Sequence, residues 1–260
     1  MAEVLQVQSL DRALDIIEAL CRANRGMAIR DLADATRLNK STVYRMLQTL
    51  RRRGFVMQDE DTGRYYMTTR LYDLGNQVVQ HLDILETVRR PMERLCTAVG
   101  ETIHFVIPEG PDIVYLHKVE PEKNSIQMAS RAGMHRPMYC TASGKAILAN
   151  YPEEKVRQIW HDSVITAYTP HTITEYAALQ KELLLIRQQG IAFDLEENEV
   201  GIRCIAVTIA GVRGAVEGAI SISVPQQHPV YTHMDSLIDP LIETRSQIMF
   251  QTEGGSLSTE

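Results

Sequence analysis

One stretch, residues 38–53, constrains this chain more than any other because it repeats with the period of an α-helix. Its apolar side chains recur at intervals of three and four residues, which places them on one stripe that can dock on a core. These side chains are Val43, Met46, Leu47 and Leu50. Asn39 stands where a helix N-cap is favoured, and Gly54 stands where helices commonly end. The opposite face carries Ser41, Tyr44, Arg45 and Gln48, which can donate to phosphates or base edges.

The charges around this stretch indicate a polyanionic partner. Residues 35–58 contain six basic side chains and no carboxylate, in a protein of 260 residues with a formal net charge of −6. Residues 1–70 hold 12 basic and 9 acidic residues, a net charge of +3, whereas residues 71–260 hold 15 and 24, a net charge of −9. Nucleic acid is the natural partner of the first part. The second part would be repelled from DNA and must do something else.

Two more helices and a hairpin are predicted around the basic helix. An apolar stripe that follows Ser9, a good N-cap, predicts a helix ending near Gly26, and a shorter helix is predicted over residues 29–36. The tight connection at residues 37–39 makes the last two helices a helix-turn-helix. Residues 55–58 and 64–68 flank a glycine-containing turn, which predicts a β-hairpin and therefore a winged unit.

The expected partner of this unit is a double-stranded DNA operator. Arg64, next to the hairpin tip, can reach the DNA backbone or a minor groove. The DNA-binding candidates are Lys40, Ser41, Thr42, Tyr44, Arg45 and Arg64.

The rest of the chain predicts an α/β domain. Residues 71–82 read as a linker helix in which Gly75 leaves room for close packing, and a second helix from about residue 83 contains Pro91. Strands are expected over residues 102–107, 113–119, 125–130, 191–194, 204–209 and 216–224, and helices over residues 143–149, 153–160, 175–189 and 233–250. We therefore expect an α+β protein with a DNA-binding domain at 1–70, a linker helix at 71–82 and a domain with an antiparallel sheet at 83–260.

Several motifs carry a family resemblance. Residues 39–45, the hairpin residues 63–65 and residues 71–75 resemble the amino-terminal domain of the isocitrate-lyase-regulator (IclR) family of bacterial transcription factors. Residues 139–146 resemble the small-residue effector loop of that family, and residues 194–207 resemble its signature. With residues 101–104 and 114–118, these motifs look closest to the ketodeoxygluconate-repressor branch.

This resemblance implies a GAF/PAS-like ligand-sensing domain in the second part of the chain. It also implies a ligand-responsive regulator, a repressor rather than an activator. Dimers would be joined through the DNA-binding domains and would pair into tetramers through the effector domains.

Two segments of the second part are candidates for an effector site. The loop at residues 141–144 opens into a helix, so amides near Ala142 and Ser143 could bind a carboxylate at the positive end of the helix dipole. A tightly packed turn is the alternative. Ser221 and Ser223 alternate with isoleucines and share one face of a strand. They either line an internal cavity or form a solvated edge.

Asp194 follows a strand and precedes an acidic stretch in which Glu196, Glu197 and Glu199 read as solvated surface charges. For a lone aspartate, a loop cap or a surface salt bridge is the alternative. The resemblance implies that Asp194 and Cys204 contact an effector, Cys204 as a small apolar side chain rather than a nucleophile. The effector-binding candidates are Ala142, Ser143, Asp194, Cys204, Ser221 and Ser223, and the expected ligand is a small carboxylate such as a 2-keto or sugar acid.

An enzyme and a protein-binding adaptor are the competing readings. Cys140 or Ser143 could form a triad on paper with His104 and Asp194, but no G-x-S-x-G elbow supports it. The histidines form no HxxxH or HxH pair, so a metal site would need ligands from distant parts of the chain. We expect no metal, no cofactor and no enzymatic activity. The acid-free basic helix argues against an adaptor that binds only proteins.

We also expect a cytoplasmic protein without membrane contact. No apolar run approaches the roughly 18–20 residues that span a bilayer. Residues 1–20 read as an amphipathic helix with acids, not as a signal peptide. The four cysteines form no CxxC pair, which indicates reduced thiols.

Overall fold

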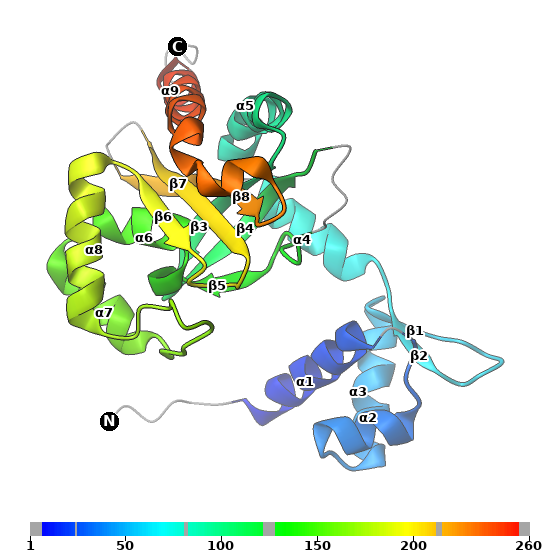
Figure 1. Cartoon of the computed structure of the whole chain (residues 1–260). Helices are drawn as coiled ribbons and strands as arrows, with labels where there is room; N and C mark the ends of the chain where they lie inside the picture. Colours follow the sequence, from blue (N-terminus) through cyan, green and yellow to red (C-terminus); the bar gives the residue numbers. More distant parts are fainter. Residues whose placement is uncertain (1–6, 24, 81–82, 122–127, 212–214, 255–260) are drawn as a thin grey trace. The chain divides into compact units, whose positions relative to one another are not determined.

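The computed structural model (Figure 1) describes residues 7–23, 25–80, 83–121, 128–211 and 215–254. The chain separates into two compact units, Met1–His81 and Leu82–Glu260. Each unit is described by itself.

The first unit is a winged helix-turn-helix, as the sequence predicts. Its elements are α1 (Gln8–Arg22), α2 (Ile29–Thr36), α3 (Lys40–Arg52), β1 (Val56–Gln58), β2 (Tyr65–Met67) and α4 (Arg70–Gln80). The strands β1 and β2 pair antiparallel, and Met27 adds a single bridge to Tyr65. The buried side chains of this unit form one core, which includes Ile16, Leu20, Leu32, Val43, Leu47, Leu50 and Tyr65.

The turn between α2 and α3 is made by a residue other than glycine. Arg37 has φ 55°, in the left-handed region, and the amide of Leu38 donates to the carbonyl of Ala33 at 3.1 Å. Gly54 has φ 76° and ends α3, as predicted. Two cap predictions need correction: α1 begins at Gln8 after Val7 instead of after Ser9, and the side chain of Asn39 makes no cap hydrogen bond at the start of α3.

The second unit is an α/β domain with a six-stranded antiparallel sheet in the order β5-β4-β3-β8-β7-β6. The strands are β3 (Thr102–Glu109), β4 (Asp112–Val119), β5 (His135–Pro137), β6 (Ala192–Leu195), β7 (Ile202–Ala210) and β8 (Val216–Pro225). The α-helices are α5 (Asp83–Val99), α6 (Ala142–Ala149), α7 (Glu153–Asp162), α8 (Tyr176–Gln189) and α9 (Ile238–Gly254). Three short 3₁₀ helices cover Met138–Cys140, Pro229–Thr232 and Met234–Leu237.

The helices cover the two faces of this sheet. Figure 1 shows α6, α7 and α8 on one side and α5 and α9 on the other. The first face packs small sheet residues against α6 and α8, and Ala192, Ala206 and Ala219 belong to that cluster. Side chains alternate along a strand, so Ser221 and Ser223 share the α6 side with Ala219. Ile220 and Ile222 point to the other side.

Three predictions for this unit differ from the structure. The strand predicted over residues 125–130 lies outside the described residues up to residue 127, and residues 128–130 form no strand. The short strand β5 was not predicted. The closing helix begins at Ile238 instead of His233, because Pro240 lacks an amide proton and is tolerated only in the first turn of a helix.

Two further findings concern packing and membranes. Gly75 in α4 is exposed, and an added Cβ there would meet no atom within 4 Å, so close packing within the described chain does not explain this glycine. None of the helices in the described ranges is long and apolar enough to cross a bilayer.

Candidate DNA-binding and effector sites

The helix α3 turns its predicted DNA-binding face to the outside. Val43 and Leu47 are fully buried, so the apolar stripe holds the helix on the core of the first unit. On the other face Lys40, Ser41 and Arg45 are exposed, Tyr44 is 50% exposed, and Thr42 is half-buried. Within the described chain, no carboxylate forms an ion pair with a basic side chain of α3, so its positive charges remain available to an anion.

Arg64 has a structural task in addition to its predicted contact with DNA. Its side chain lies beside the wing turn and is exposed, yet Nη1 donates to the carbonyl of Gly26 at 2.6 Å. This hydrogen bond ties the hairpin to the connection between α1 and α2. The other donors of the guanidinium have no hydrogen-bond partner among the residues that the structure describes, so they can reach a phosphate.

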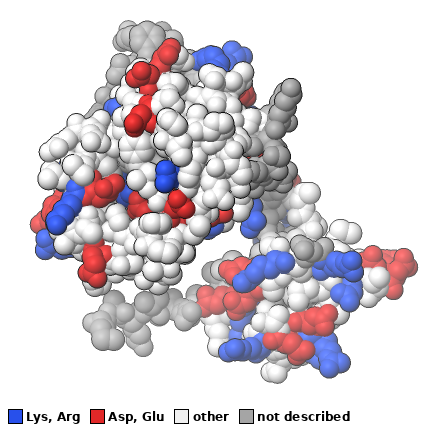
Figure 2. All heavy atoms as spheres, viewed as in Figure 1, with Lys and Arg blue, Asp and Glu red and all other residues white. Residues whose placement is uncertain are grey.

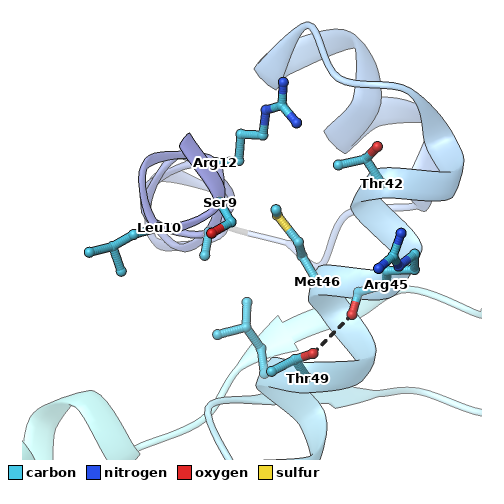
Figure 3. A pocket seen from close by; sticks show the side chains of 9 residues that line it. Ser9, Leu10, Arg12, Thr42, Arg45, Met46 and Thr49 are labelled. Carbon is cyan, nitrogen blue, oxygen red and sulfur yellow. Dashed lines mark hydrogen bonds between the residues drawn. The ribbon is translucent and has the colours of Figure 1, made fainter. Parts of the chain in front are cut away.

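A hollow of about 560 Å³ between α1 and α3 brings in a residue that the sequence analysis missed. Figure 3 shows Arg12 of α1 and Thr42 of α3 on opposite sides of this hollow, with Met46 between them and Arg45 at the rim. Thr49 also lines it and donates its hydroxyl to the carbonyl of Arg45 at 3.1 Å. No acidic residue lines the hollow. The sequence could have indicated Arg12, because this basic residue lies on the predicted first helix close to the face that packs on α3.

The charge of the first unit is not spread evenly over its surface. Figure 2 shows basic and acidic side chains interspersed on the visible face of this unit, while much of the visible face of the second unit carries no charge. The acids of the described part of the first unit lie on α1, α2, the wing turn and α4, outside residues 35–58. Basic side chains without neighbouring acids in the sequence are therefore concentrated in residues 35–58, which include α3.

In the second unit, the strand register brings four of the six predicted effector residues together. Asp194 on β6 pairs with Cys204 on β7, and Cys204 pairs with Ser223 on β8. Ser221 pairs with His104 on the neighbouring strand β3. Ser221 and Ser223 are only 4% and 5% exposed, so they lie in the interior. The alternative prediction, that they form a solvated edge, is wrong.

Hydrogen bonds continue this polar row across the sheet. The Sγ atom of Cys204 lies 3.1 Å from Oγ of Ser223, which lies 3.3 Å from Nδ1 of His104. The other ring nitrogen of His104 lies 2.7 Å from Oγ of Ser130, and the ring of Tyr115 packs edge-on against His104. Sequence reasoning named His104 only as a possible member of a triad.

The protonation states of this row favour ligand binding over nucleophilic attack. Burial, with a smaller effect of the nearby Lys118, lowers the pKa of His104 to about 3, so its imidazole is neutral. Burial raises the pKa of the Cys204 thiol far above its ordinary range and that of Cys140 to about 12. A nucleophilic cysteine needs its thiolate form, which neither residue provides at neutral pH.

Asp194 is buried and caps a loop at the same time. It is 2% exposed, and its Oδ1 accepts hydrogen bonds from the amides of Glu197 at 2.6 Å and Asn198 at 3.4 Å. Burial, followed by the charge of Glu197, raises the pKa of Asp194 to about 7. Near neutral pH this carboxyl group can therefore donate or accept a hydrogen bond.

Glu197 is not the solvated surface charge that the acidic stretch suggested. It is 6% exposed and forms an ion pair with Lys145 of α6, which is fully buried. The ammonium of Lys145 also lies 3.2 Å from Glu182 of α8. A buried ammonium requires such partners, because its desolvation is otherwise very unfavourable. The sequence could have indicated this buried ion pair, because Lys145 is the one charged residue of α6.

The loop at residues 141–144 is largely explained by packing. Thr141 accepts a hydrogen bond from the amide of Gly144 at 3.2 Å and donates to the carbonyl of Pro137 at 3.1 Å. A Cβ at Gly144 would clash with the backbone of Met138, so only glycine fits there. Ala142 and Ser143 are buried at the start of α6, and their contact with a carboxylate remains a prediction.

No group of three or more His, Cys, Asp or Glu side chains in the described part of the chain is arranged to hold a metal ion.

Comparison with known proteins agrees with both units. Residues 9–60 match the IclR helix-turn-helix domain, and residues 76–250 match the bacterial transcriptional regulator IclR C-terminal domain. The chain is 36% identical to the DNA-binding transcriptional repressor YiaJ of Escherichia coli K12, over 93% of this chain and 86% of that protein. It is also 36% identical to the HTH-type transcriptional regulator KdgR of the same organism, over 84% of this chain and 82% of that protein.

A solved structure extends the agreement to the fold. The IclR of Thermotoga maritima matches with a TM-score of 0.81 and 31% sequence identity, covering 95% of this chain and 99% of that chain. The relatives are transcriptional regulators, and the unit that carries α3 is a DNA-binding helix-turn-helix. The chain therefore belongs to the IclR family of bacterial transcriptional regulators, near its KdgR branch.

Proposed function

We propose that this protein is a cytoplasmic repressor of a carbohydrate or sugar-acid catabolic operon, released from its operator by a small carboxylate. The observation that carries the proposal is the buried polar row of the second unit, Asp194, Cys204, Ser223 and His104. A row of polar donors and acceptors inside a domain is unfavourable to bury unless it serves a polar ligand or a complete network. The repressor name of the relative YiaJ favours repression over activation.

The chemistry of the row suggests how the effector binds. Its carboxylate would lie on the amides near Ala142 and Ser143 at the start of α6, where the helix dipole is positive. Its hydroxyl or keto oxygens would meet Asp194, Ser221 and Ser223. An effector changes DNA affinity only if it binds the DNA-competent and DNA-incompetent arrangements unequally, so binding must alter how two recognition helices are spaced.

The proposed operator-binding form is a dimer joined through the first units. Val7, which directly precedes α1, is 62% exposed, and Leu10 and Leu14 of α1 are 59% and 47% exposed. Their spacing of three and four residues forms a second apolar stripe, separate from the buried Ile16 and Leu20. A second copy would cover this stripe and present two copies of α3 to a pseudo-palindromic operator. Pairing of two dimers through the second units would give a tetramer.

The test measures operator release. Full-length protein is titrated with operator DNA in the presence of single 2-keto acids and sugar acids, after a thermal-shift screen has identified those that stabilise the fold. The Asp194→Ala variant should bind operator normally but need about 10- to 150-fold more effector, because a hydrogen bond to a charged group is worth roughly 1.5–3 kcal/mol.

Two results would contradict the proposal. An Asp194→Ala variant that releases DNA at the wild-type effector concentration would show that Asp194 does not contact the effector. If no anionic sugar or keto acid stabilises the protein, the carboxylate effector itself is wrong. The matched control is Asp162→Ala, which removes an exposed carboxylate of α7 and should change neither quantity.

A further inference from the structure

A second polar cleft lies at the opposite end of α6 from the proposed effector loop. It has a volume of about 250 Å³ and lies where the last turns of α6 and α8 meet β7 and α9. Its polar side chains are Asn150, Arg187, Thr208 and Arg245. Among the described residues, none with a carboxylate lines it. Because α6 has eight residues, the cleft and the effector loop are separated by roughly 12 Å along the helix.

The wall formed by Arg187 and Asn150 is held in place by hydrogen bonds. Nε of Arg187 donates to the carbonyl of Ala149 at 2.7 Å, and its Nη2 donates to the carbonyl of Tyr151 at 3.2 Å. The side-chain amide of Asn150 donates to the carbonyl of Ala146 at 2.9 Å and to the hydroxyl of Thr208 at 3.4 Å. These bonds orient the polar groups. The charge of Arg187 acts on Glu153, but that carboxylate does not line the cleft.

Arg245 faces the same cleft from a different helix. It is half-buried on α9, and within the described residues its side chain has neither an ion pair nor a hydrogen bond. A structural cap on the end of α6 explains Arg187 but not the second guanidinium. Two like charges beside one small cleft repel each other, and an anion between them removes that repulsion.

We propose that this cleft is a second ligand site, which binds a small oxyanion of the phosphate or carboxylate class between Arg187 and Arg245. The planar fork of a guanidinium matches two oxygens of either group. The hydroxyl of Thr208 and the amide of Asn150 lie on the same cleft and can bind further oxygens. The site does not depend on the proposed effector row, because it shares no residue with that row.

The test is calorimetric titration of the full-length protein with inorganic phosphate and, in a separate arm, with malonate, at fixed ionic strength. Arg245→Gln should weaken binding at least about tenfold, the change that corresponds to roughly 1.4 kcal/mol. Arg245→Lys keeps the positive charge but loses the planar guanidinium, so its affinity for the anion should lie between those of the wild type and Arg245→Gln. Arg157→Gln removes an exposed arginine of α7 that does not line the cleft, and should bind as the wild type does.

Comparison of phosphate with malonate identifies the class of oxyanion. The proposal is supported if either anion binds, if Arg245→Gln weakens that binding, and if Arg157→Gln does not change it. No binding in both arms overturns it. Binding that Arg245→Gln leaves unchanged also overturns it and assigns the anion to another surface, such as the arginines of the first unit. An unchanged thermal unfolding temperature of Arg245→Gln without anion shows that the variant is folded.

Discussion

At the scale of single residues, Asp194 has the most unusual chemistry of the second unit. Its pKa is about 7 in the folded protein, against an ordinary value of 3.8. A carboxyl group with a raised folded-state pKa contributes stability that is fully present below its unfolded pKa. That contribution is lost as the pH rises through the folded pKa. Asp194 therefore destabilises the fold increasingly between about pH 4 and pH 7.

Replacement of Asp194 by asparagine separates its effect on pH-dependent stability from the effects of the other titrating groups. Asp194→Asn keeps an acceptor oxygen for the amides of Glu197 and Asn198 but cannot ionise. Relative to this variant, the wild type should lose on the order of 1.4 kcal/mol of unfolding free energy per pH unit up to about pH 7. Above that pH the difference should stay constant. Urea denaturation at pH 5, 6, 7 and 8 measures it, and parallel curves for the two proteins would disprove the raised pKa.

Sequence reasoning named Asp194, Cys204 and Ser223 as effector-binding candidates. It did not assign His104 to the row, and it missed the ion pair beside the row. The periodicity of β8 placed Ser221 and Ser223 on one face, yet burial depends on α6, which covers that face. Glu197 belongs to an acidic stretch that is typical of a surface. Its partner Lys145 lies 52 residues away in the chain, so only the tertiary fold reveals the pair.

At the scale of secondary structure elements, we predict that α1 and α3 make two different kinds of contact with DNA. Arg45 is exposed near the middle of α3 and is predicted to read a base. Arg12 reaches the same hollow from α1 and is positioned for a phosphate (Figure 3). Base contacts discriminate between sequences, whereas phosphate contacts add affinity that does not depend on sequence.

These two roles predict different mutant behaviour. Arg45→Ala should cost about 1–3 kcal/mol on the operator and much less on unrelated DNA. Arg12→Gln should weaken binding to both DNAs alike and reduce the salt slope by about one. Fluorescence anisotropy at several salt concentrations measures both quantities. The control is Arg22→Gln on the same helix, whose guanidinium forms an exposed ion pair with Glu18. An Arg45→Ala variant that loses affinity equally for both DNAs would exclude base readout.

The long strands of the second unit could be predicted from the sequence, whereas the short strand β5 could not. The strands β3, β4, β7 and β8 are long and bounded by turn residues, and all four were predicted within three residues of their ends. By contrast, β5 has only three residues and includes two that are common outside strands, Arg136 and Pro137. It exists because it pairs with β4, and such a long-range pairing leaves no periodicity in the sequence.

At the scale of the whole molecule, the proposed function requires that two copies of α3 act together. A single winged helix contacts one half-site, and linking two of them converts the second binding event into an intramolecular one. The first unit has an apolar surface suited to this task, the stripe formed by Val7 at the start of α1 and by Leu10 and Leu14 on the helix. Burial of each leucine would contribute about 1.5–3 kcal/mol.

The double variant Leu10→Asp/Leu14→Asp should therefore dissociate the dimer, weakening self-association by roughly 100-fold or more. Its affinity for the full operator should fall much more steeply than its affinity for a single half-site, because α3 is not altered and only the hollow beside Leu10 gains a negative charge. Sedimentation equilibrium measures association, and anisotropy measures both DNAs. Leu184→Asp is the control, since Leu184 on α8 is 53% exposed but lies in the second unit. A double variant that still dimerises and binds the full operator would show that another surface joins the two recognition helices.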